Sequence, residues 1–240
     1  MADARRLIAG LALAFTACTN APSVVALATL ERTVGVGEGP VVVMLHGYGS
    51  APEHFLGLAN RTDLPAGTHF VFPRAPLAIP DVDHGTMWWP LPTDLEEIPR
   101  RREPGMDEAR VRVSALLDRL AEAYPHRPML LGGFSQGAMV SLDVALHDPR
   151  PLAGIALLSG TMIDEADTVP RLERLRGRRM YVSHGTHDQV LRYEGDAHLV
   201  ELMREHGADV HFTTFTGAHV VTDDVSTELA AFITRCASAP

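Results

Sequence analysis

The sequence predicts an α/β protein with a mostly parallel central sheet flanked by helices. First, residues 40–46 form a continuous apolar run rich in β-branched residues, and residues 68–73 give a second strand ended by Pro73, as expected for strands buried in a parallel sheet. Second, segments with helical spacing of apolar residues alternate with such runs. Third, residues 130–139 combine an apolar run, a glycine–serine turn and a helical segment. Parallel sheets place functional groups at the carboxyl ends of their strands, so we searched those ends first.

The elements are predicted in order along the chain after residue 25. Residues 106–124 are predicted to be an amphipathic helix, because Val113, Leu116, Leu117 and Leu120 share one face. Pro125 ends this helix. His206-Gly207 likewise closes the helix over 194–205. The segment 74–104 is rich in proline and is predicted to be a long surface loop without regular elements. The predicted strands are 40–46, 68–73, the run before Ser135, 152–159, 179–184 and 210–215, and the predicted helices are 52–58, 106–124, 136–147, 194–205 and 223–236.

Composition limits the classes of function. A chain of 240 residues with 46% hydrophobic residues can bury one sizeable core, so we expect one catalytic domain over residues 26–240. The net charge of -9 argues against nucleic acid as a partner, because phosphates repel an acidic surface. The 12 histidines include no His-x-x-x-His or His-Glu-x-x-His pair, so no metal is expected. The two cysteines have no metal-ligand spacing.

Residues 1–25 are predicted to be a leader and tether. Arg5-Arg6, the short apolar core 7–15 and the small residues before Cys18 are typical of a secretory signal peptide, and the core is too short to span a membrane. The sequence ending at Cys18 resembles a bacterial lipoprotein cleavage box, although Phe15 departs from its usual aliphatic residue. It therefore predicts an exported protein, periplasmic or attached to a membrane through a lipidated Cys18.

Two alternatives for this segment stay open. In one, it is a frayed apolar helix on a cytoplasmic enzyme, a reading that Asp3 in the charged region slightly favours. In the other, Cys18 pairs with Cys236 in a disulfide between the chain ends.

A Gly-x-Ser-x-Gly segment is centred on Ser135. After a strand and before a helix, this pattern predicts a nucleophile elbow, a turn so sharp that the serine takes a strained backbone and exposes its Oγ. Gly133 and Gly137 stand where a side chain would collide with the neighbouring strand and helix. The alternative is a plain glycine-rich turn.

Two further strand ends hold partners for such a serine. Asp188 follows the strand over 179–184, and His219 follows the strand over 210–215. The order serine, acid, histidine is that of an α/β-hydrolase triad. In that scheme His219 is the general base and Asp188 orients its imidazole. Asp164 is the rival acid, and the nearby histidines at 184 and 187 are interpreted as packing or loop residues.

A serine nucleophile also needs backbone N–H donors for the oxyanion of its tetrahedral intermediate. The elbow itself supplies the amide of Gln136. We assign the second donor to Tyr48, with Gly47 as the less favoured choice, in the glycine-containing turn after the first buried strand. The alternative for this turn is a simple break between strand and loop.

Together these segments resemble the phospholipase/carboxylesterase family of α/β-hydrolases, over nearly the whole chain after the leader. The resemblance implies a compact sheet without a large cap domain, no cofactor, a triad of Ser135, Asp188 and His219, and oxyanion donors on Tyr48 and Gln136. Ala218 precedes the histidine here, where relatives commonly have glycine. The matching segments are 45–49, Pro73-Arg74-Ala75-Pro76, 133–137, Leu158-Ser159-Gly160, His184-Gly185-x-x-Asp188 and Gly217-Ala218-His219.

The substrate pocket is the least determined part. Arg74, Trp88 and Trp89 lie in the long loop, near where family members bind the acyl or alcohol part of the substrate, so they are candidate groove residues. The alternative, weighed equally, is that the tryptophans anchor the loop to the core. Arg100-Arg101-Arg102 is interpreted as a solvated face, with docking to an anionic membrane as the alternative.

The function that follows is a serine carboxylesterase acting on a small-molecule ester with a small to medium acyl group, through an acyl-enzyme. A lysophospholipase or acyl thioesterase is the alternative, and a peptidase on the same fold is less favoured. The alternative from another class is an inactive hydrolase-fold binding protein. The sequence does not specify an oligomeric state.

Overall fold

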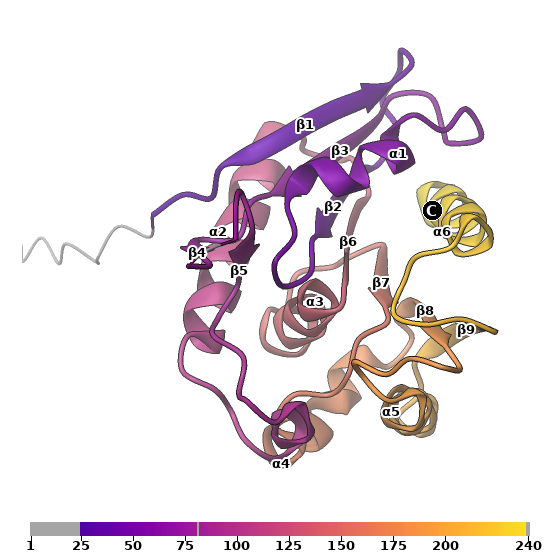
Figure 1. Cartoon of the computed structure of the whole chain (residues 1–240). Helices are drawn as coiled ribbons and strands as arrows, with labels where there is room; N and C mark the ends of the chain where they lie inside the picture. Colours follow the sequence, from indigo (N-terminus) through magenta and orange to yellow (C-terminus); the bar gives the residue numbers. More distant parts are fainter. Residues whose placement is uncertain (1–24, 81, 239–240) are drawn as a thin grey trace, which may run out of the picture.

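The computed structural model describes residues 25–80 and 82–238. Its centre is a seven-stranded sheet in the order β1-β3-β2-β6-β7-β8-β9 (Figure 1). Only the β1–β3 pair in this sheet is antiparallel. The predicted α/β class with a mostly parallel sheet is therefore confirmed. Its strands are β1 (Thr29–Val34), β2 (Val41–Leu45), β3 (Thr68–Pro73), β6 (Met129–Phe134), β7 (Gly154–Leu158), β8 (Arg179–Gly185) and β9 (Asp209–Phe215).

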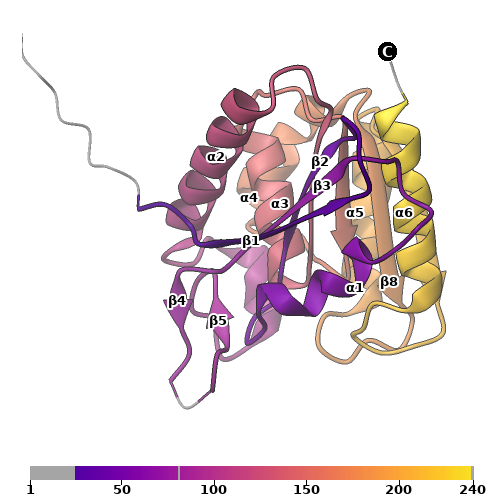
Figure 2. The same cartoon turned by 90° about the horizontal axis from the view of Figure 1, so that it is seen from above.

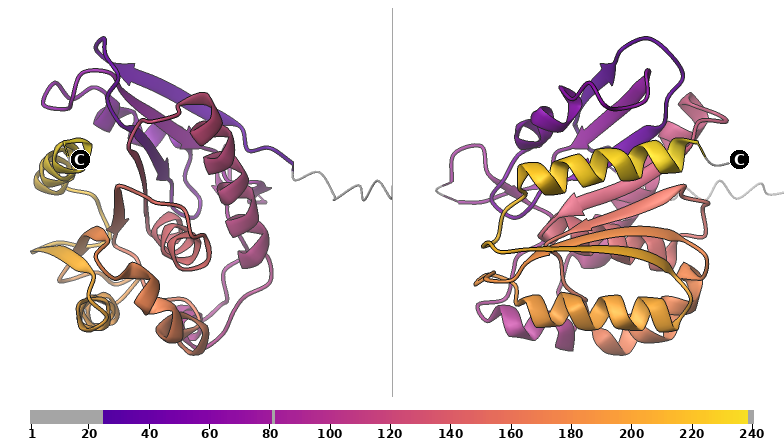
Figure 3. Two further views of the ribbon diagram at one scale, coloured as in Figure 1. Left: turned by 180° about the vertical axis from the view of Figure 1, so that it is seen from behind. Right: turned by 90° about the vertical axis from the view of Figure 1, so that its right-hand side faces the viewer.

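Helices cover both faces of this sheet. Successive residues of β2 belong to different apolar clusters, Val43 to one and Val42 to the other, because side chains alternate along a strand. Figure 2 shows α2 and α3 on the side opposite α6, and the right panel of Figure 3 shows α5 and α6 on opposite faces. The helices are α1 (Leu56–Ala59), α2 (Met106–Ala123), α3 (Gln136–His147), α4 (Glu165–Thr168), α5 (Tyr193–Glu205) and α6 (Asp223–Ala237).

The structure adds elements that the sequence analysis did not identify. Strand β1 has a mostly exposed side-chain pattern, so it lacks the continuous apolar run that marks the central strands. The prediction that 74–104 holds no regular element is wrong: it contains β4 (Leu77–Ala78), β5 (Thr86–Met87) and a 3-10 helix, Leu95–Arg100. Two-residue strands are too short to show a periodicity. Two further 3-10 helices are Pro52–Phe55, which leads into α1, and Val169–Leu175, which follows α4.

The leader and Cys18 lie outside the described residues, so the lipidation and disulfide predictions concern a segment that the structure does not describe. Cys236 is buried in α6, and burial raises the pKa of its thiol. Within residues 25–80 and 82–238, no helix is long and apolar enough to cross a membrane.

Candidate active site

Ser135 occupies a strained turn between β6 and α3. Its backbone has φ 55° and ψ -120°, a conformation that residues with a side chain rarely adopt. The two flanking glycines allow this turn to pack. A Cβ on Gly133 would lie 2.4 Å from the carbonyl carbon of Gly137, and one on Gly137 would lie 2.0 Å from the Leu45 carbonyl oxygen. The turn therefore has the strand, strain and close contacts expected of a nucleophile elbow, and its serine is half-buried.

The predicted acid and histidine are hydrogen-bonded to each other. His219 Nδ1 lies 2.6 Å from Asp188 Oδ2, and the Asp188 side chain is fully buried. The other oxygen, Oδ1, accepts hydrogen bonds from the backbone N–H groups of Val190 and Leu191. Hydrogen bonds therefore hold both carboxylate oxygens in place. The imidazole of His219 is directed by an anionic acceptor that is itself fixed.

Adjacent parallel strands bring this pair next to the serine. Asp188 and His219 lie in the loops after β8 and β9, which pair along their whole length, and the His187 N–H donates to the Gly217 carbonyl between those loops. The His219 ring lies 4.7 Å, centroid to centroid, from the ring of Phe134, the residue before the serine. All three predicted residues thus converge at the carboxyl edge of the sheet.

The rival groups lie elsewhere. Asp164 begins α4 with φ 43°, and its N–H donates to the Ile98 carbonyl. Among the described contacts, the carboxylate bonded to His219 is that of Asp188. His187 is exposed, whereas His184 is fully buried, with Nδ1 2.8 Å from Asp196 Oδ2. The sequence analysis did not identify Asp196, because only the packing of α5 on β8 brings it to this histidine.

The turn after β2 approaches the serine closely. A Cβ added to Gly47 would lie 3.2 Å from Ser135 Cβ, so a side chain here would press on the serine turn. Within the described residues, no acceptor takes a hydrogen bond from the N–H of Tyr48 or of Gln136. Gln136 is also the first residue of α3, where the helix dipole favours negative charge. Both predicted oxyanion donors are therefore free to bind an anion.

A buried histidine fixes this turn. His46 Nε2 accepts a hydrogen bond from the N–H of Ala75 at 3.1 Å, and its Nδ1 lies 2.8 Å from the Gly47 carbonyl. Since an N–H can only donate and a carbonyl can only accept, Nδ1 carries the proton. Burial lowers the pKa of His46 to about 4. The imidazole is therefore neutral near pH 7 and bridges the turn to the start of the long loop.

The two tryptophans require a correction. Trp88 is 1% exposed and Trp89 is 0% exposed, and neither lines the cleft beside His219. The side-chain amide of Gln136 accepts from the Trp88 N–H and donates to the Trp89 carbonyl, while the Trp88 indole donates to the His46 carbonyl. The groove interpretation is wrong for both side chains, which instead anchor the long loop to the core.

Arg74 also lies outside the cleft. Its guanidinium contacts the carboxylate of Glu53 at 2.9 Å and donates to the His84 carbonyl. It therefore connects the loop containing β4 and β5 to the 3-10 helix before α1.

The cleft beside His219 has a volume of about 450 Å³. It runs between the α1 segment and the start of α6 and carries apolar side chains with a few polar groups at its rim, which is typical of a small-molecule site. Its polar rim includes Ser50, His54, Arg61 and Asp223. The sequence analysis did not identify its apolar walls, because helix orientation decides which face they line. Those walls are Phe55, Leu58, Phe134, Leu158 and Leu229.

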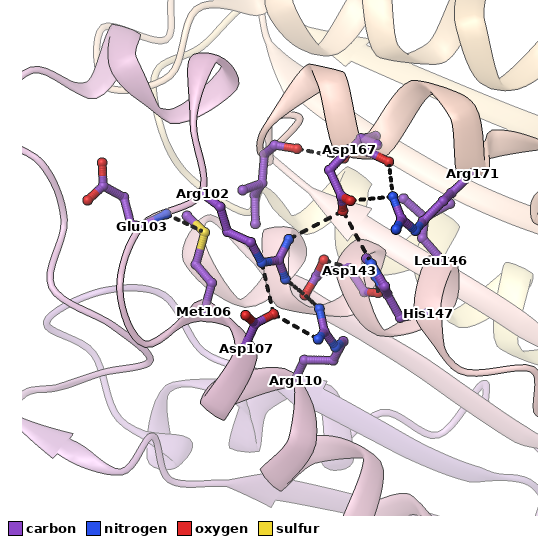
Figure 4. Close-up of polar contacts among 12 residues, drawn as sticks. Arg102, Glu103, Met106, Asp107, Arg110, Asp143, Leu146, His147, Asp167 and Arg171 are labelled. Carbon is purple, nitrogen blue, oxygen red and sulfur yellow. Dashed lines mark hydrogen bonds and ion pairs between the residues drawn. The ribbon is translucent and has the colours of Figure 1, made fainter.

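An ion-pair network joins the loop before α2 to α3 and α4 (Figure 4). Arg102 lies 2.7 Å and Arg110 3.2 Å from Asp143 Oδ2. Asp143, His147 and Asp167 lie close enough together to hold a metal ion. Guanidinium groups already contact both carboxylates, since Arg102 also lies 3.6 Å from Asp167. The solvated-face interpretation therefore needs correction at Arg102, whose side chain is 20% exposed. It fits the neighbouring arginines, at 64% and 59%.

Together, the parallel sheet, the elbow after β6 and the loops after β8 and β9 define an α/β-hydrolase. The model of the Phospholipase/Carboxylesterase family matches residues 35–237. The chain therefore belongs to this family, which supports an ester-hydrolysing enzyme.

Individual relatives are similar over most of the chain. An acyl-protein thioesterase 1 of Mycosarcoma maydis is 27% identical over 89% of this chain and 98% of its own. A probable carboxylesterase of Oryza sativa subsp. japonica is 27% identical over 76% of this chain and 67% of its own. The crystal structure of esterase PE8 superposes with a TM-score of 0.73 at 26% identity, covering 88% of this chain and 98% of that one.

Proposed function

We propose that the protein is a serine carboxylesterase that cleaves small to medium acyl esters through an acyl-enzyme. The observation that carries the proposal is the 2.6 Å bond between His219 and Asp188, beside a serine held in a strained elbow. His219 would accept the Ser135 proton as Oγ attacks the ester carbonyl, and Asp188 would stabilise the resulting imidazolium.

The oxyanion of the tetrahedral intermediate would be bound by the N–H groups of Tyr48 and Gln136. Collapse of the intermediate breaks the bond to the alcohol, which leaves with the proton from His219 and leaves the acyl group on Ser135. Water then repeats the sequence, with His219 as base, and releases the acid. The cleft beside His219 supports a substrate with one short apolar group, because its volume is about 450 Å³ and its walls are apolar.

The bond cleaved is tested with a panel of substrates. Nitrophenyl esters with acyl chains of graded length, an acyl thioester and a lysophospholipid are each incubated with the protein and with Ser135→Ala. A burst of nitrophenol equal to the enzyme concentration, absent from Ser135→Ala, is expected for an acyl-enzyme. Preference for the thioester would favour the activity that the fungal relative's name states. Failure to cleave any of these substrates would indicate a binding protein.

We also propose that the leader exports the chain and that lipidation of Cys18 attaches it to a membrane. The support is the arrangement of residues 1–18 in the sequence, and more than one acyl chain is needed for stable attachment. Expressed with its own leader in a bacterium, the protein should fractionate with membranes, and Cys18→Ser should abolish that. An intact mass that starts at Met1 in the cytosol would contradict both export and lipidation.

A further inference from the structure

A buried histidine–aspartate pair lies behind the proposed triad. His184 is the penultimate residue of strand β8, and Asp196 lies in the first turn of α5. Both side chains are 0% exposed, and the distance from His184 Nδ1 to Asp196 Oδ2 is 2.8 Å. On the other side of the ring, Nε2 lies 2.9 Å from the Leu191 carbonyl oxygen and 3.3 Å from Asp188 Oδ2. The proposed mechanism gives neither residue of the pair a task.

The hydrogen-bond partners determine where the protons lie. A carbonyl oxygen only accepts, so Nε2 of His184 must carry a hydrogen that points to Leu191. Nδ1 and the Asp196 carboxyl then share one proton. Burial raises the pKa of Asp196, and the hydrogen bond to Asp196 raises the pKa of His184 against the effect of burial. With one shared proton the pair is neutral as a unit, which lowers the cost of burying it.

This arrangement acts on Asp188 by two routes. The Leu191 carbonyl accepts from His184 while the Leu191 N–H donates to Asp188 Oδ1 at 3.0 Å, so the histidine fixes the backbone that holds one carboxylate oxygen. The same Nε2–H lies 3.3 Å from Oδ2, the oxygen that is bonded to His219. Within residues 25–80 and 82–238, the other titratable ring that packs against His184 is that of Tyr193, 6.2 Å away between centroids.

We propose that His184 and Asp196 are positioning residues, which hold the Asp188 carboxylate and its loop in the orientation that directs His219. The inference rests on the proposed function, because it assigns the pair a role in the same reaction. Asp196 sets the His184 ring so that Nε2–H points to Leu191 and Asp188, and His184 then holds the same carboxylate oxygen that His219 contacts. Neither residue touches the substrate.

The first test removes the carboxyl group behind His184. Asp196→Ala should lower kcat by about 10- to 100-fold with KM changed less than about threefold, since a displacement of about 1 Å remote from the chemistry can cost this much. Asp196→Asn should restore most of kcat, because its amide N–H can donate to Nδ1. Glu194→Ala is the matched control, an exposed acid in the same turn of α5. Rates are divided by the active sites titrated with a fluorophosphonate, which removes unfolded protein from the comparison.

A second pair of variants keeps the proposal testable if Asp196→Ala does not fold. The amide nitrogen of His184→Gln can occupy the position of Nε2 and donate to Leu191, whereas that of His184→Asn is too short to do so. We expect His184→Gln to retain more kcat than His184→Asn. The reverse order, or an Asp196→Ala kcat equal to that of Glu194→Ala, would overturn the inference.

A spectroscopic readout separates positioning from a merely structural role and does not depend on turnover. The proton in the 2.6 Å bond between His219 Nδ1 and Asp188 should resonate at low field in the proton NMR spectrum. Asp196→Ala should shift or broaden this resonance, and Glu194→Ala should not. An unchanged resonance in folded Asp196→Ala contradicts the inference. If the parent protein cleaves no ester and reacts with no fluorophosphonate, the proposed function fails, while this spectrum still decides the positioning role.

Discussion

His219 Nδ1 and Asp188 Oδ2 lie 2.6 Å apart across 31 residues of sequence. The bond joins the loops after β8 and β9, and the carboxylate is fully buried, so its charge acts on the imidazole with little screening by water. Asp188→Asn should therefore lower kcat by about 10⁴-fold, because an amide favours the wrong imidazole tautomer. The measurement is steady-state hydrolysis of a nitrophenyl ester.

Asp164→Asn is the matched control for this substitution. Asp164 has φ 43°, in the left-handed region that asparagine also tolerates, so the same chemical change should leave the fold and most of the activity in place. If Asp164→Asn had the larger effect, the acid would have to be reassigned.

Removal of the nucleophile is the second prediction. Ser135→Ala should reduce turnover by about 10⁶-fold, since the members of a triad act as a unit. A fluorophosphonate should modify Ser135 in the parent protein, as judged by peptide mass spectrometry. Labelling that persists in Ser135→Ala would exclude Ser135 as the nucleophile.

The strain at this serine gives a prediction about stability. With φ at 55°, any residue with a Cβ is disfavoured, whereas glycine is not. Ser135→Gly should therefore be more stable than Ser135→Ala by about 1 kcal/mol, after the greater entropy of glycine in the unfolded chain is subtracted from the relieved strain. Chemical denaturation of both variants measures the difference. Equal stabilities would show that the turn is not strained.

The strand ends explain why so much of this site could be predicted from the sequence. Ser135 and Asp188 follow the buried strands β6 and β8, and His219 follows β9, whose side chains are partly exposed. Parallel strands bring these three carboxyl ends to one edge of the sheet. The elbow glycines mark the turn independently of any partner. These patterns are local, so they can be recognised in the sequence without knowing how the helices pack.

The remaining features depend on packing at a distance. Phe55, at the end of the 3-10 helix before α1, and Leu229 of α6 line the same cleft, although more than 170 residues separate them in the sequence. The resemblance to the family leaves Trp88 and Trp89 equally open as groove residues or as anchors of the long loop, and their burial favours the anchors. The loop is held down by the Gln136 side chain, a contact across 48 and 47 residues that no periodicity reveals.

The cleft gives a prediction about acyl-chain length. Gly57 lines it, and no atom lies within 4 Å of the position that a Cβ would take. A larger side chain should therefore enter the cleft without disturbing the core. Gly57→Leu should lower kcat/KM for an octanoate ester by about tenfold or more and for an acetate ester by less than about threefold, since each methylene excluded from an apolar pocket costs about tenfold or more.

Gly57→Ala supplies the graded comparison, with a smaller bulk and a better helix former. Its kcat/KM for the octanoate ester should lie between those of the parent and Gly57→Leu. If Gly57→Leu lowered kcat/KM equally for the octanoate and acetate esters, the cleft would not hold the acyl chain.

The buried imidazole beneath the proposed oxyanion turn predicts how stability depends on pH. Burial lowers the pKa of His46 to about 4 from its ordinary value of 6.5, so the folded state binds fewer protons than the unfolded state between these values. The stabilisation is complete above the unfolded pKa and is lost progressively as pH falls toward the folded pKa. A difference of about 2.5 pKa units corresponds to about 3 kcal/mol at most.

Urea unfolding of the parent and His46→Gln isolates this contribution from that of the carboxylates. The glutamine can still accept from the Ala75 N–H but does not titrate, so the variant should be the less stable protein near pH 7 and the two free energies of unfolding should converge toward about pH 4. Parallel curves would mean that His46 does not change its protonation on unfolding.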